Sequence, residues 1–188
     1  MSVTFKAPSG DRTLLWSTGF MVSFAIASLA LLLLAGGYAG LRINLTPSAP
    51  LGLWRIVDLE RPVRFGDRVF VCPPLSAAIR EAFRRGYLHK GLCPGFLAPL
   101  IKTVAAEAGQ HVAVSDRVTI DGHPLPNSKL MAFDALARPL LAHPSGIVPR
   151  GQVYLHSDYP GSFDSRYFGP VPVANILGLA QEVLTHAP

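Results

Sequence analysis

A long run without charge constrains this chain more than any other feature of its sequence. No Asp, Glu, Lys, Arg or His occurs between residues 14 and 41, and the centre of the run reads GFMVSFAIASLALLLLAGGYAG. About 20 apolar residues are enough to cross a bilayer as a helix. The run therefore predicts one transmembrane helix over residues 14–38, with an N-terminal tail at residues 1–13 and a further domain at residues 39–188. A cleaved signal peptide is the alternative, because AGGYAG contains small residues that suit processing.

The charge distribution leaves the orientation of this helix open and argues against one class of partner. Basic residues lie on both sides of the apolar run, so their count does not decide the topology, and long domains translocate largely regardless of charge. The net charge of +5 fits a domain beside anionic lipid. The basic residues are scattered, with only Arg84 and Arg85 adjacent, and no nucleic-acid-binding motif is present. We therefore expect the lipid bilayer, and no nucleic acid, among the partners.

The cysteine pattern indicates a disulfide or two free thiols rather than a metal site. The chain has two cysteines, Cys72 and Cys93, and no histidine or further cysteine is spaced to bind zinc with them. The sequence therefore predicts no metal ion and no cofactor. A disulfide is expected if the domain is extracytoplasmic, and two reduced thiols are expected if it is cytosolic.

Short strands separated by turns predict a mainly β domain after the apolar run. The segments LGLWRIV, GDRVFVC and GQVYLHS are typical of strands, and Asp121-Gly122 is a strong hairpin signal. One helix is expected in LSAAIREAFRRG, where apolar residues follow helical spacing and Gly86 provides a stop. This helix would belong to a Cys-flanked insertion at about residues 73–98. Residues 128–149 and the segment DYPGSFDSRYFGPVP are expected to be irregular, and ANILGLAQEVL is expected to be a strand or a short helix.

Lys102 and Ser48 are the residues whose surroundings point to chemistry. In PLIKTVAAEA, a strand would place Lys102 on a face of apolar side chains, where its charge is costly to bury. One interpretation is a lysine that extends to solvent at a strand edge. The other is a desolvated lysine, neutral enough to act as a general base. Ser48 lies between Pro47 and Pro50, which limit its backbone, and a serine with a lysine suffices for nucleophilic attack on a carbonyl.

Four segments in series resemble the motifs of the type I signal peptidase family. They are TPSAPLG after the apolar run, RFGDRVFV, IKTVAAEAGQHV and GSFDSRYFGPV, and their order and spacing agree over residues 44–180. The short chain, the segment NLTPSAPLGLW and the Cys-flanked insertion are most similar to the conjugative-transfer (TraF-type) branch, which processes pilin precursors. The resemblance implies a mostly β signal-peptidase fold, whose core is shared with self-cleaving repressors of the LexA type.

On the nucleophile side, the resemblance implies that Ser48 is the attacking residue. It also implies an oxyanion hole formed by the Thr46 hydroxyl and the Ser48 backbone N–H. A donor aimed at the developing oxyanion contributes about 3 kcal/mol to transition-state stabilisation. The alternative for Thr46 is a residue that only shapes the turn before Pro47.

On the base side, the resemblance implies that Lys102 is the general base and that Ser162 orients its amine. Asp164 and Arg166 correspond to an ion pair that braces the loop, and in the conjugative branch the aspartate itself is implicated in activity. The alternatives are ordinary turn residues for Ser162 and Asp164 and a weak surface pair for Asp164 and Arg166.

The chain departs from the family pattern at three places. Ala49 replaces the methionine that commonly follows the nucleophile, His-Ser-Asp at residues 156–158 replaces Gly-Asp-Asn, and Gln110 replaces an aspartate after glycine. These changes favour a specialised substrate. His156 and Asp158 also allow a Ser–His–Asp hydrolase. Because no GxSxG motif is present, we expect His156 to line or brace the site instead.

The expected function is a membrane-anchored serine endopeptidase that matures a pilin or another secreted precursor for conjugative plasmid transfer, by hydrolysis or by cyclisation of the product. The resemblance implies a single-pass protein of the bacterial inner membrane, with its catalytic domain on the periplasmic side and with other conjugation or secretion components as partners. The alternatives are a general type I signal peptidase and a non-enzymatic bitopic assembly factor of a secretion channel, in which Ser48 is only a linker residue.

Overall fold

The computed structural model describes residues 12–187 and separates the chain into two compact units, Met1–Gly40 and Leu41–Pro188. Helix α1 (Arg12–Tyr38) occupies most of the described part of the first unit. Within residues 12–187, no helix is both long and apolar enough to cross a membrane. The transmembrane helix expected at residues 14–38 stays a prediction, and most of the expected tail at residues 1–13 lies outside the described residues.

Strands dominate the second unit, so the prediction of a mainly β domain is confirmed. The strands are β1 (Leu41–Asn44), β2 (Leu51–Val57), β3 (Arg68–Val71), β4 (Lys90–Cys93), β5 (Leu100–Ala106), β6 (His111–Val114), β7 (Val118–Ile120), β8 (His123–Pro124), β9 (Gly146–Ile147), β10 (Gln152–His156), β11 (Val171–Pro172) and β12 (Ile176–His186). The helices of this unit are α2 (Ala77–Arg84), α3 (Ser165–Phe168) and the 3-10 turns η1 (Pro94–Phe96) and η2 (Val173–Asn175).

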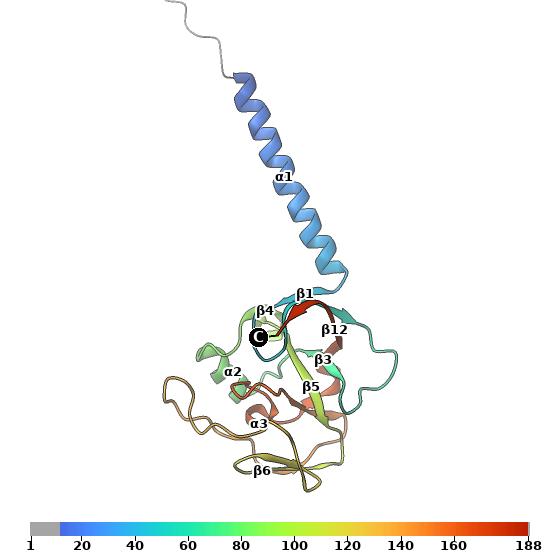
Figure 1. Cartoon of the computed structure of the whole chain (residues 1–188), viewed down its shortest axis with the longest axis vertical. Helices are drawn as coiled ribbons and strands as arrows, with labels where there is room; N and C mark the ends of the chain where they lie inside the picture. Colours follow the sequence, from blue (N-terminus) through green and yellow to red (C-terminus); the bar gives the residue numbers. More distant parts are fainter. Residues whose placement is uncertain (1–11, 188) are drawn as a thin grey trace, which may run out of the picture. The chain divides into compact units, whose positions relative to one another are not determined.

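Two antiparallel sheets organise the second unit. The larger sheet has the strand order β1-β2-β12-β3-β5-β10-β11, and the smaller has the order β8-β7-β6-β9. Figure 1 shows β1 and β6 at opposite ends of this unit. In the larger sheet, β5 lies between β3 and β10, with Lys102 opposite Val69. The lysine strand is therefore an interior strand, whereas β1 and β2 form a hairpin at one edge.

Alternating side chains along β3 build apolar clusters on both faces of the larger sheet. Val69 and Val71 belong to one cluster, and Phe70 belongs to another with Trp54 and Ile101. Successive side chains of a strand point to opposite faces, so both faces of β3 are covered. A third cluster joins the smaller sheet to β5 and β10.

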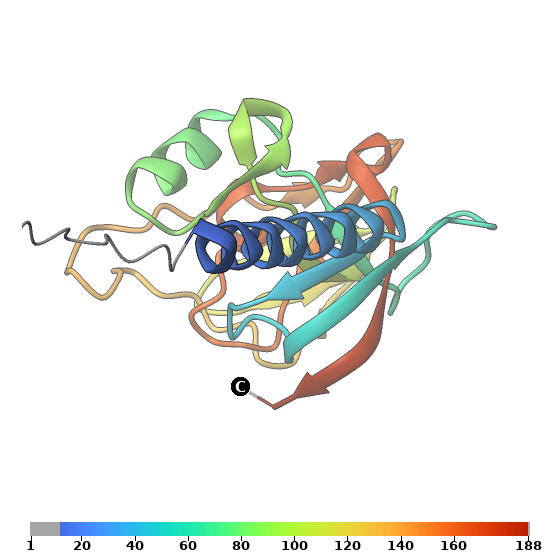
Figure 2. The same ribbon diagram turned by 90° about the horizontal axis from the view of Figure 1, so that it is seen from above.

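The segment between β3 and β5 contains the predicted helix. Helix α2 begins after Ser76, whose side chain accepts a hydrogen bond from the Ile79 N–H, and it buries Ile79 and Ala82. Gly86 follows with φ at 81°, a conformation that glycine adopts without strain and that commonly ends helices. Figure 2 shows α2 and β4 on one flank of the unit, and β1, β2 and the end of β12 on the other.

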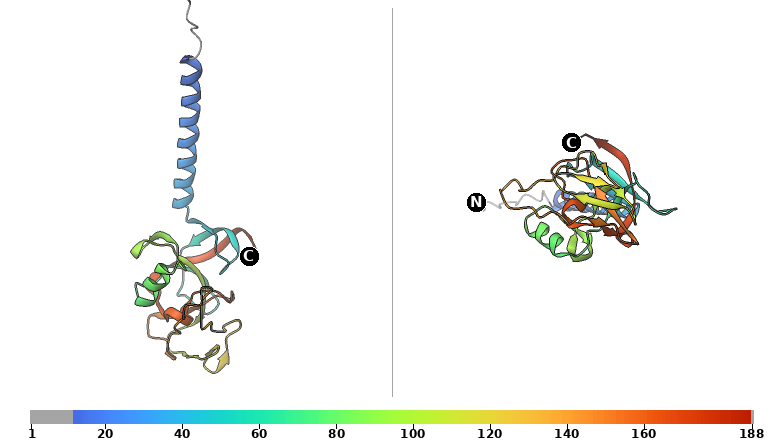
Figure 3. Two further views of the ribbon diagram at one scale, coloured as in Figure 1. Left: turned by 90° about the vertical axis from the view of Figure 1, so that its left-hand side faces the viewer. Right: turned by 90° about the horizontal axis from the view of Figure 1, so that it is seen from below.

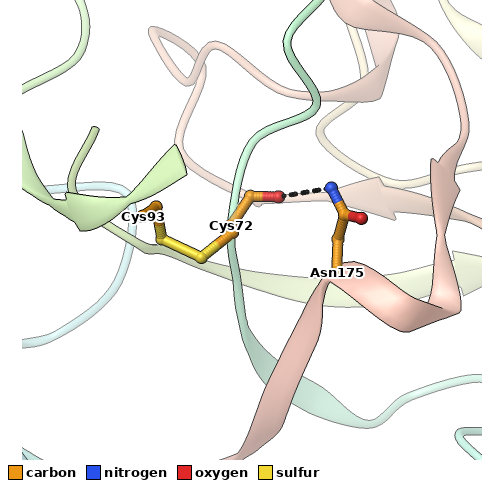
Figure 4. Close-up of a disulfide and its surroundings, with 3 residues drawn as sticks. All are labelled: Cys72, Cys93 and Asn175. Carbon is orange, nitrogen blue, oxygen red and sulfur yellow. Dashed lines mark hydrogen bonds between the residues drawn. A yellow bond between two sulfur atoms is a disulfide. The ribbon is translucent and has the colours of Figure 1, made fainter. Parts of the chain in front are cut away.

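A disulfide joins Cys72 and Cys93, whose Cα atoms lie 5.5 Å apart, so the expected bridge is confirmed. Asn175 Nδ2 donates a hydrogen bond to the Cys72 carbonyl oxygen at 3.0 Å (Figure 4). The Cys72 N–H in turn donates to the Asn175 carbonyl oxygen at 2.9 Å. The disulfide closes the insertion, and the Asn175 contacts attach it to the chain just before β12.

Four other segments can be compared with their local sequence patterns. Asp121 and Gly122 form the expected turn between β7 and β8, with φ values of 49° and 82°. The segment ANILGLAQEVL is mostly a strand, because from Ile176 onward it belongs to β12, which pairs with both β2 and β3. The segment DYPGSFDSRYFGPVP is not wholly irregular, because Asp164 caps α3 by accepting a hydrogen bond from the Arg166 N–H at 3.1 Å. Apart from β9, residues 128–149 are irregular, and part of this segment projects as an extended loop (Figure 3).

Candidate active site

A cavity of about 330 Å³ in the second unit contains both residues of the predicted dyad. Its walls come from the loop after β1, from β3 and β5, and from the loop after β10, and they include Pro47, Ser48, Ala49, Lys102, His156 and Ser157. Four segments that are separated in the sequence therefore meet around one space.

The loop at residues 45–50 connects β1 to β2 and contains Ser48. The two strands pair as far as Asn44, so the loop closes a hairpin. Ser48 is half-buried, and its Oγ lies 3.4 Å from Thr46 Oγ1. From the opposite wall, Ser157 Oγ donates a hydrogen bond to the Ser48 carbonyl oxygen at 2.6 Å. Among the described residues, no acceptor is bonded to the Ser48 backbone N–H.

Lys102 lies on β5 with only 3% of its surface exposed. Its Nζ donates a hydrogen bond to Ser162 Oγ at 2.8 Å. Burial lowers the pKa of Lys102 to about 8, while the carboxylate of Asp164 opposes this shift and Arg166 adds to it. The interpretation of a lysine that extends to solvent is therefore wrong. The amine loses its proton at a much lower pH than an exposed lysine does.

Asp164 and Arg166 form a buried ion pair, with neither side chain exposed. Arg166 Nε lies 2.8 Å from Asp164 Oδ1, and Nη2 lies 2.9 Å from Oδ2. Arg166 also donates to the carbonyl oxygens of Ser162 at 3.0 Å and Lys129 at 2.8 Å. Burial raises the pKa of Asp164, but the neighbouring His156 and Arg166 side chains lower it below its ordinary value. The alternative of a weak surface pair is therefore wrong, and the pair holds the main chain of Ser162.

His156 lies in the cavity wall, and its ring faces the base side. Its Nε2 lies 3.1 Å from the Pro126 carbonyl oxygen, and its Nδ1 lies 3.4 Å from Asp164 Oδ2. The Asp158 side chain is 80% exposed and lies 3.8 Å from Nε2. Among the described residues, no hydrogen bond joins His156 to Ser48, so the geometry favours the bracing role over a Ser–His–Asp triad. Within residues 12–187, no group of three or more His, Cys, Asp or Glu side chains is suited to hold a metal ion.

Two polar side chains contact the nucleophile loop although the sequence did not assign them to the site. Asn44 binds several backbone groups of the loop, and Ser157 bonds across the cavity to Ser48. Both contacts are made to main-chain atoms, so they depend on loop conformation rather than on residue spacing. The only sequence signal was the asparagine directly before a proline-rich loop, because asparagine side chains often bond to nearby backbone groups.

Comparisons with known proteins agree with this site. The family model described as "Signal peptidase, peptidase S26" matches residues 13–185. The chain belongs to the signal peptidase S26 family. Within this family, it is 60% identical over 154 residues, 82% of each chain, to the probable conjugal transfer protein TraF of Sinorhizobium fredii (strain NBRC 101917 / NGR234). It is 50% identical to the conjugal transfer protein TraF of Agrobacterium tumefaciens (strain 15955) over 177 residues, which are 94% of this chain and 98% of that protein.

These matches confirm the resemblance to type I signal peptidases and to their TraF-type branch. A crystal structure of a signal peptidase I from Enterococcus faecalis V583 aligns with 65% of this chain and 98% of its own, at 22% identity and a TM-score of 0.39. That likeness adds no argument to the assignment to the S26 family.

Proposed function

We propose that this S26 peptidase is a membrane-anchored serine endopeptidase that matures a pilin-like or other secreted precursor for conjugative plasmid transfer. The observation that carries the proposal is a buried lysine, Lys102, bound to Ser162 in the wall of the cavity that Ser48 also lines. The conjugal transfer names of the two relatives support the biological setting.

Acylation begins when the neutral amine of Lys102 accepts the proton of the Ser48 hydroxyl. Ser48 Oγ then attacks the carbonyl carbon of the scissile peptide bond. Negative charge develops on the carbonyl oxygen, where the Ser48 N–H and the Thr46 hydroxyl donate hydrogen bonds worth about 3 kcal/mol each. The C–N bond breaks, the departing amine takes the proton from Lys102, and the acyl group stays on Ser48 as an ester.

Ser162 and the buried ion pair prepare Lys102 for this step. A neutral amine has two hydrogens and one lone pair, so donation to Ser162 Oγ restricts the direction of the lone pair. The Asp164–Arg166 pair holds Ser162 through its carbonyl oxygen. Because Lys102 must be neutral to accept a proton and has a pKa of about 8, we expect processing to rise with pH through about 8.

The ester on Ser48 can be released by two acceptors. Water gives a free carboxyl end on the mature product, with Ser48 regaining its proton through Lys102. The amino group at the other end of the same precursor gives a new peptide bond and a cyclic product. The cyclic product is lighter than the linear mature peptide by one water molecule, so mass distinguishes the two reactions.

The uncharged run supports a single anchor at residues 14–38 in the bacterial inner membrane, followed by a catalytic domain at residues 39–188. The disulfide supports a periplasmic location for that domain, because this compartment is oxidising. Other conjugation components are expected partners there. A C-terminal reporter that is active only in the periplasm tests the orientation, and an inactive reporter on an intact membrane-bound fusion would contradict it.

The experiment that tests the proposed activity is co-expression with candidate pilin precursors, followed by intact-mass analysis of the products. We expect the unaltered chain to shorten its precursor, and Ser48→Ala and Lys102→Met to leave it unprocessed while remaining folded. Lys129→Met is the matched control, because Lys129 is exposed and contributes only its carbonyl oxygen to Arg166. Normal processing by either dyad variant would refute the dyad.

A general signal peptidase is the second candidate, because the matching family model is described by that activity. Complementation of a strain depleted of its own leader peptidase separates the two. Growth would indicate broad substrate use, whereas no growth combined with pilin processing would indicate the specialised role.

A further inference from the structure

Asn44 is the last residue of β1, and its side chain points into the loop that contains Ser48. Its Oδ1 accepts hydrogen bonds from two groups of Thr46, the backbone N–H at 3.1 Å and the hydroxyl at 2.8 Å. The Thr46 hydroxyl is the group expected to face the oxyanion. One asparagine oxygen therefore fixes both the main chain and the side chain of Thr46.

The other half of the same amide holds the far side of the loop. Asn44 Nδ2 lies 2.9 Å from the carbonyl oxygen of Thr46 and 3.0 Å from those of Ala49 and Pro50. An amide nitrogen carries two hydrogens, so one of them is shared between two carbonyl oxygens. The reversed amide would set its oxygen against these three carbonyls and its nitrogen against an N–H. Only one orientation of Asn44 therefore satisfies the loop.

We propose that Asn44 is a positioning residue for acylation, which holds the nucleophile loop and aligns the Thr46 hydroxyl with the oxyanion; this inference rests on the proposed Ser48 chemistry. The loop has no backbone ladder of its own, since β1 and β2 stop pairing at Asn44. Instead, three carbonyl oxygens of the loop accept hydrogen bonds from the Asn44 side chain. Trp54 Nε1 adds a second bond to the Pro50 carbonyl oxygen at 2.9 Å. Asn44 and Trp54 thus fix the loop from within the hairpin.

The bond between Thr46 and Asn44 also explains how the hydroxyl can serve two partners in turn. Before the reaction, the Thr46 hydroxyl hydrogen is donated to the neutral amide oxygen of Asn44. Once the substrate carbonyl becomes an oxyanion, it is the stronger acceptor, because charge-assisted hydrogen bonds are roughly twice as strong as neutral ones. The hydrogen can then rotate about the C–O bond while the Thr46 N–H stays on Oδ1. No heavy atom of the loop has to move, so the donor is pre-organised.

A double-mutant cycle tests this inference. The substrate is a peptide spanning the cleavage site of a precursor that the unaltered chain processes and Ser48→Ala does not. We expect Asn44→Ala to lower kcat by about 10–100-fold with KM changed less than about threefold, and Thr46→Val to lower kcat by about 100-fold. Because Asn44 acts through Thr46, adding Asn44→Ala to Thr46→Val should cost little more, and the kcat of the double variant should lie within about threefold of the kcat of Thr46→Val.

Asn175→Ala is the matched control. It removes an asparagine amide that also donates to a backbone carbonyl, on Cys72, outside the cavity. We expect it to lower the thermal midpoint and to leave kcat unchanged. An Asn44→Ala variant that behaves in the same way, with a lowered midpoint and unchanged kcat, would show that Asn44 is merely structural.

A second variant covers the case in which Asn44→Ala does not fold. Asn44→Asp keeps the size of the side chain and the acceptor for Thr46, but it removes the donor to the three carbonyls and holds the Thr46 hydroxyl more tightly. It should lower kcat about tenfold or more. Unchanged kcat in Asn44→Asp, or fully multiplicative losses in the cycle, would overturn the inference. Equal cleavage by the unaltered chain and Ser48→Ala would instead refute the proposed function.

Discussion

The two walls of the cavity are built in opposite ways. The nucleophile wall is a half-buried hairpin loop, held by neutral side chains that bond to backbone groups, chiefly Asn44 and Ser157. The base wall contains the buried amine of Lys102, and the buried Asp164–Arg166 pair supports it from outside the cavity lining; each of these three side chains is at most 3% exposed. One wall fixes the path of the main chain, and the other sets the proton affinity of an amine.

This difference predicts different consequences of mutation. A lost neutral hydrogen bond at a half-buried site costs about 1 kcal/mol, because water can replace the missing partner. A buried charge that loses its partner has no such replacement and costs several-fold more. Changes in the base wall should therefore act strongly on stability as well as on catalysis, and changes in the nucleophile wall should act mainly on catalysis.

The largest change in stability is expected for Asp164→Asn. The variant keeps the size of the side chain but leaves the guanidinium of Arg166 buried without its counter-charge, which should lower the free energy of unfolding by about 3–5 kcal/mol. Denaturant unfolding of the purified full chain measures this loss. Asp67→Asn is the matched control, since Asp67 pairs with an arginine, Arg61, that is 42% exposed, and it should lose far less. Equal losses would remove the distinction between the walls.

Lys102→Met should change stability in the other direction. Its folded-state pKa of about 8 lies below the ordinary 10.5, so the unfolded chain binds more protons between these values. Below pH 8 the lysine is charged in both states and its burial is fully unfavourable. The variant should therefore gain about 1–3 kcal/mol at pH 7, and the gain should shrink as pH rises from about 8 to 10.5. Unfolding curves across this range provide the measurement, and a pH-independent difference would show that the buried charge of Lys102 is not the cause of the gain.

The smallest change in stability is expected for Ser157→Ala, which removes the bond to the Ser48 carbonyl oxygen. The free energy of unfolding should fall by about 1 kcal/mol. Processing should slow several-fold, because the two walls lose their direct link. Ser145→Ala is the control, since Ser145 Oγ accepts from the Val114 N–H at 2.8 Å and lies outside the cavity wall. A loss of processing as large in Ser145→Ala would assign the effect of Ser157 to general destabilisation.

Local sequence patterns predicted the elements that depend on local preferences. The helical spacing in LSAAIREAFRRG corresponds to α2, and Asp121-Gly122 corresponds to the turn between β7 and β8. Helix α3 was missed because it is only four residues long and depends on the Asp164 cap. A cap of this kind requires the side chain to turn back onto its own backbone, and Asp in a Gly-rich segment fits an ordinary turn equally well.

The sequence by itself determined that Lys102 stands on an apolar strand, that the two cysteines could pair only with each other, and that the motif order is that of the S26 peptidases. The tertiary structure alone decided that Asn44 holds the nucleophile loop, that Ser157 bonds across the cavity, and that Asp164 and Arg166 are buried. The physical reason is the kind of contact. Strand and helix patterns reflect the period of neighbouring residues, whereas these bonds join main-chain atoms and side chains brought together only when the sheet has formed.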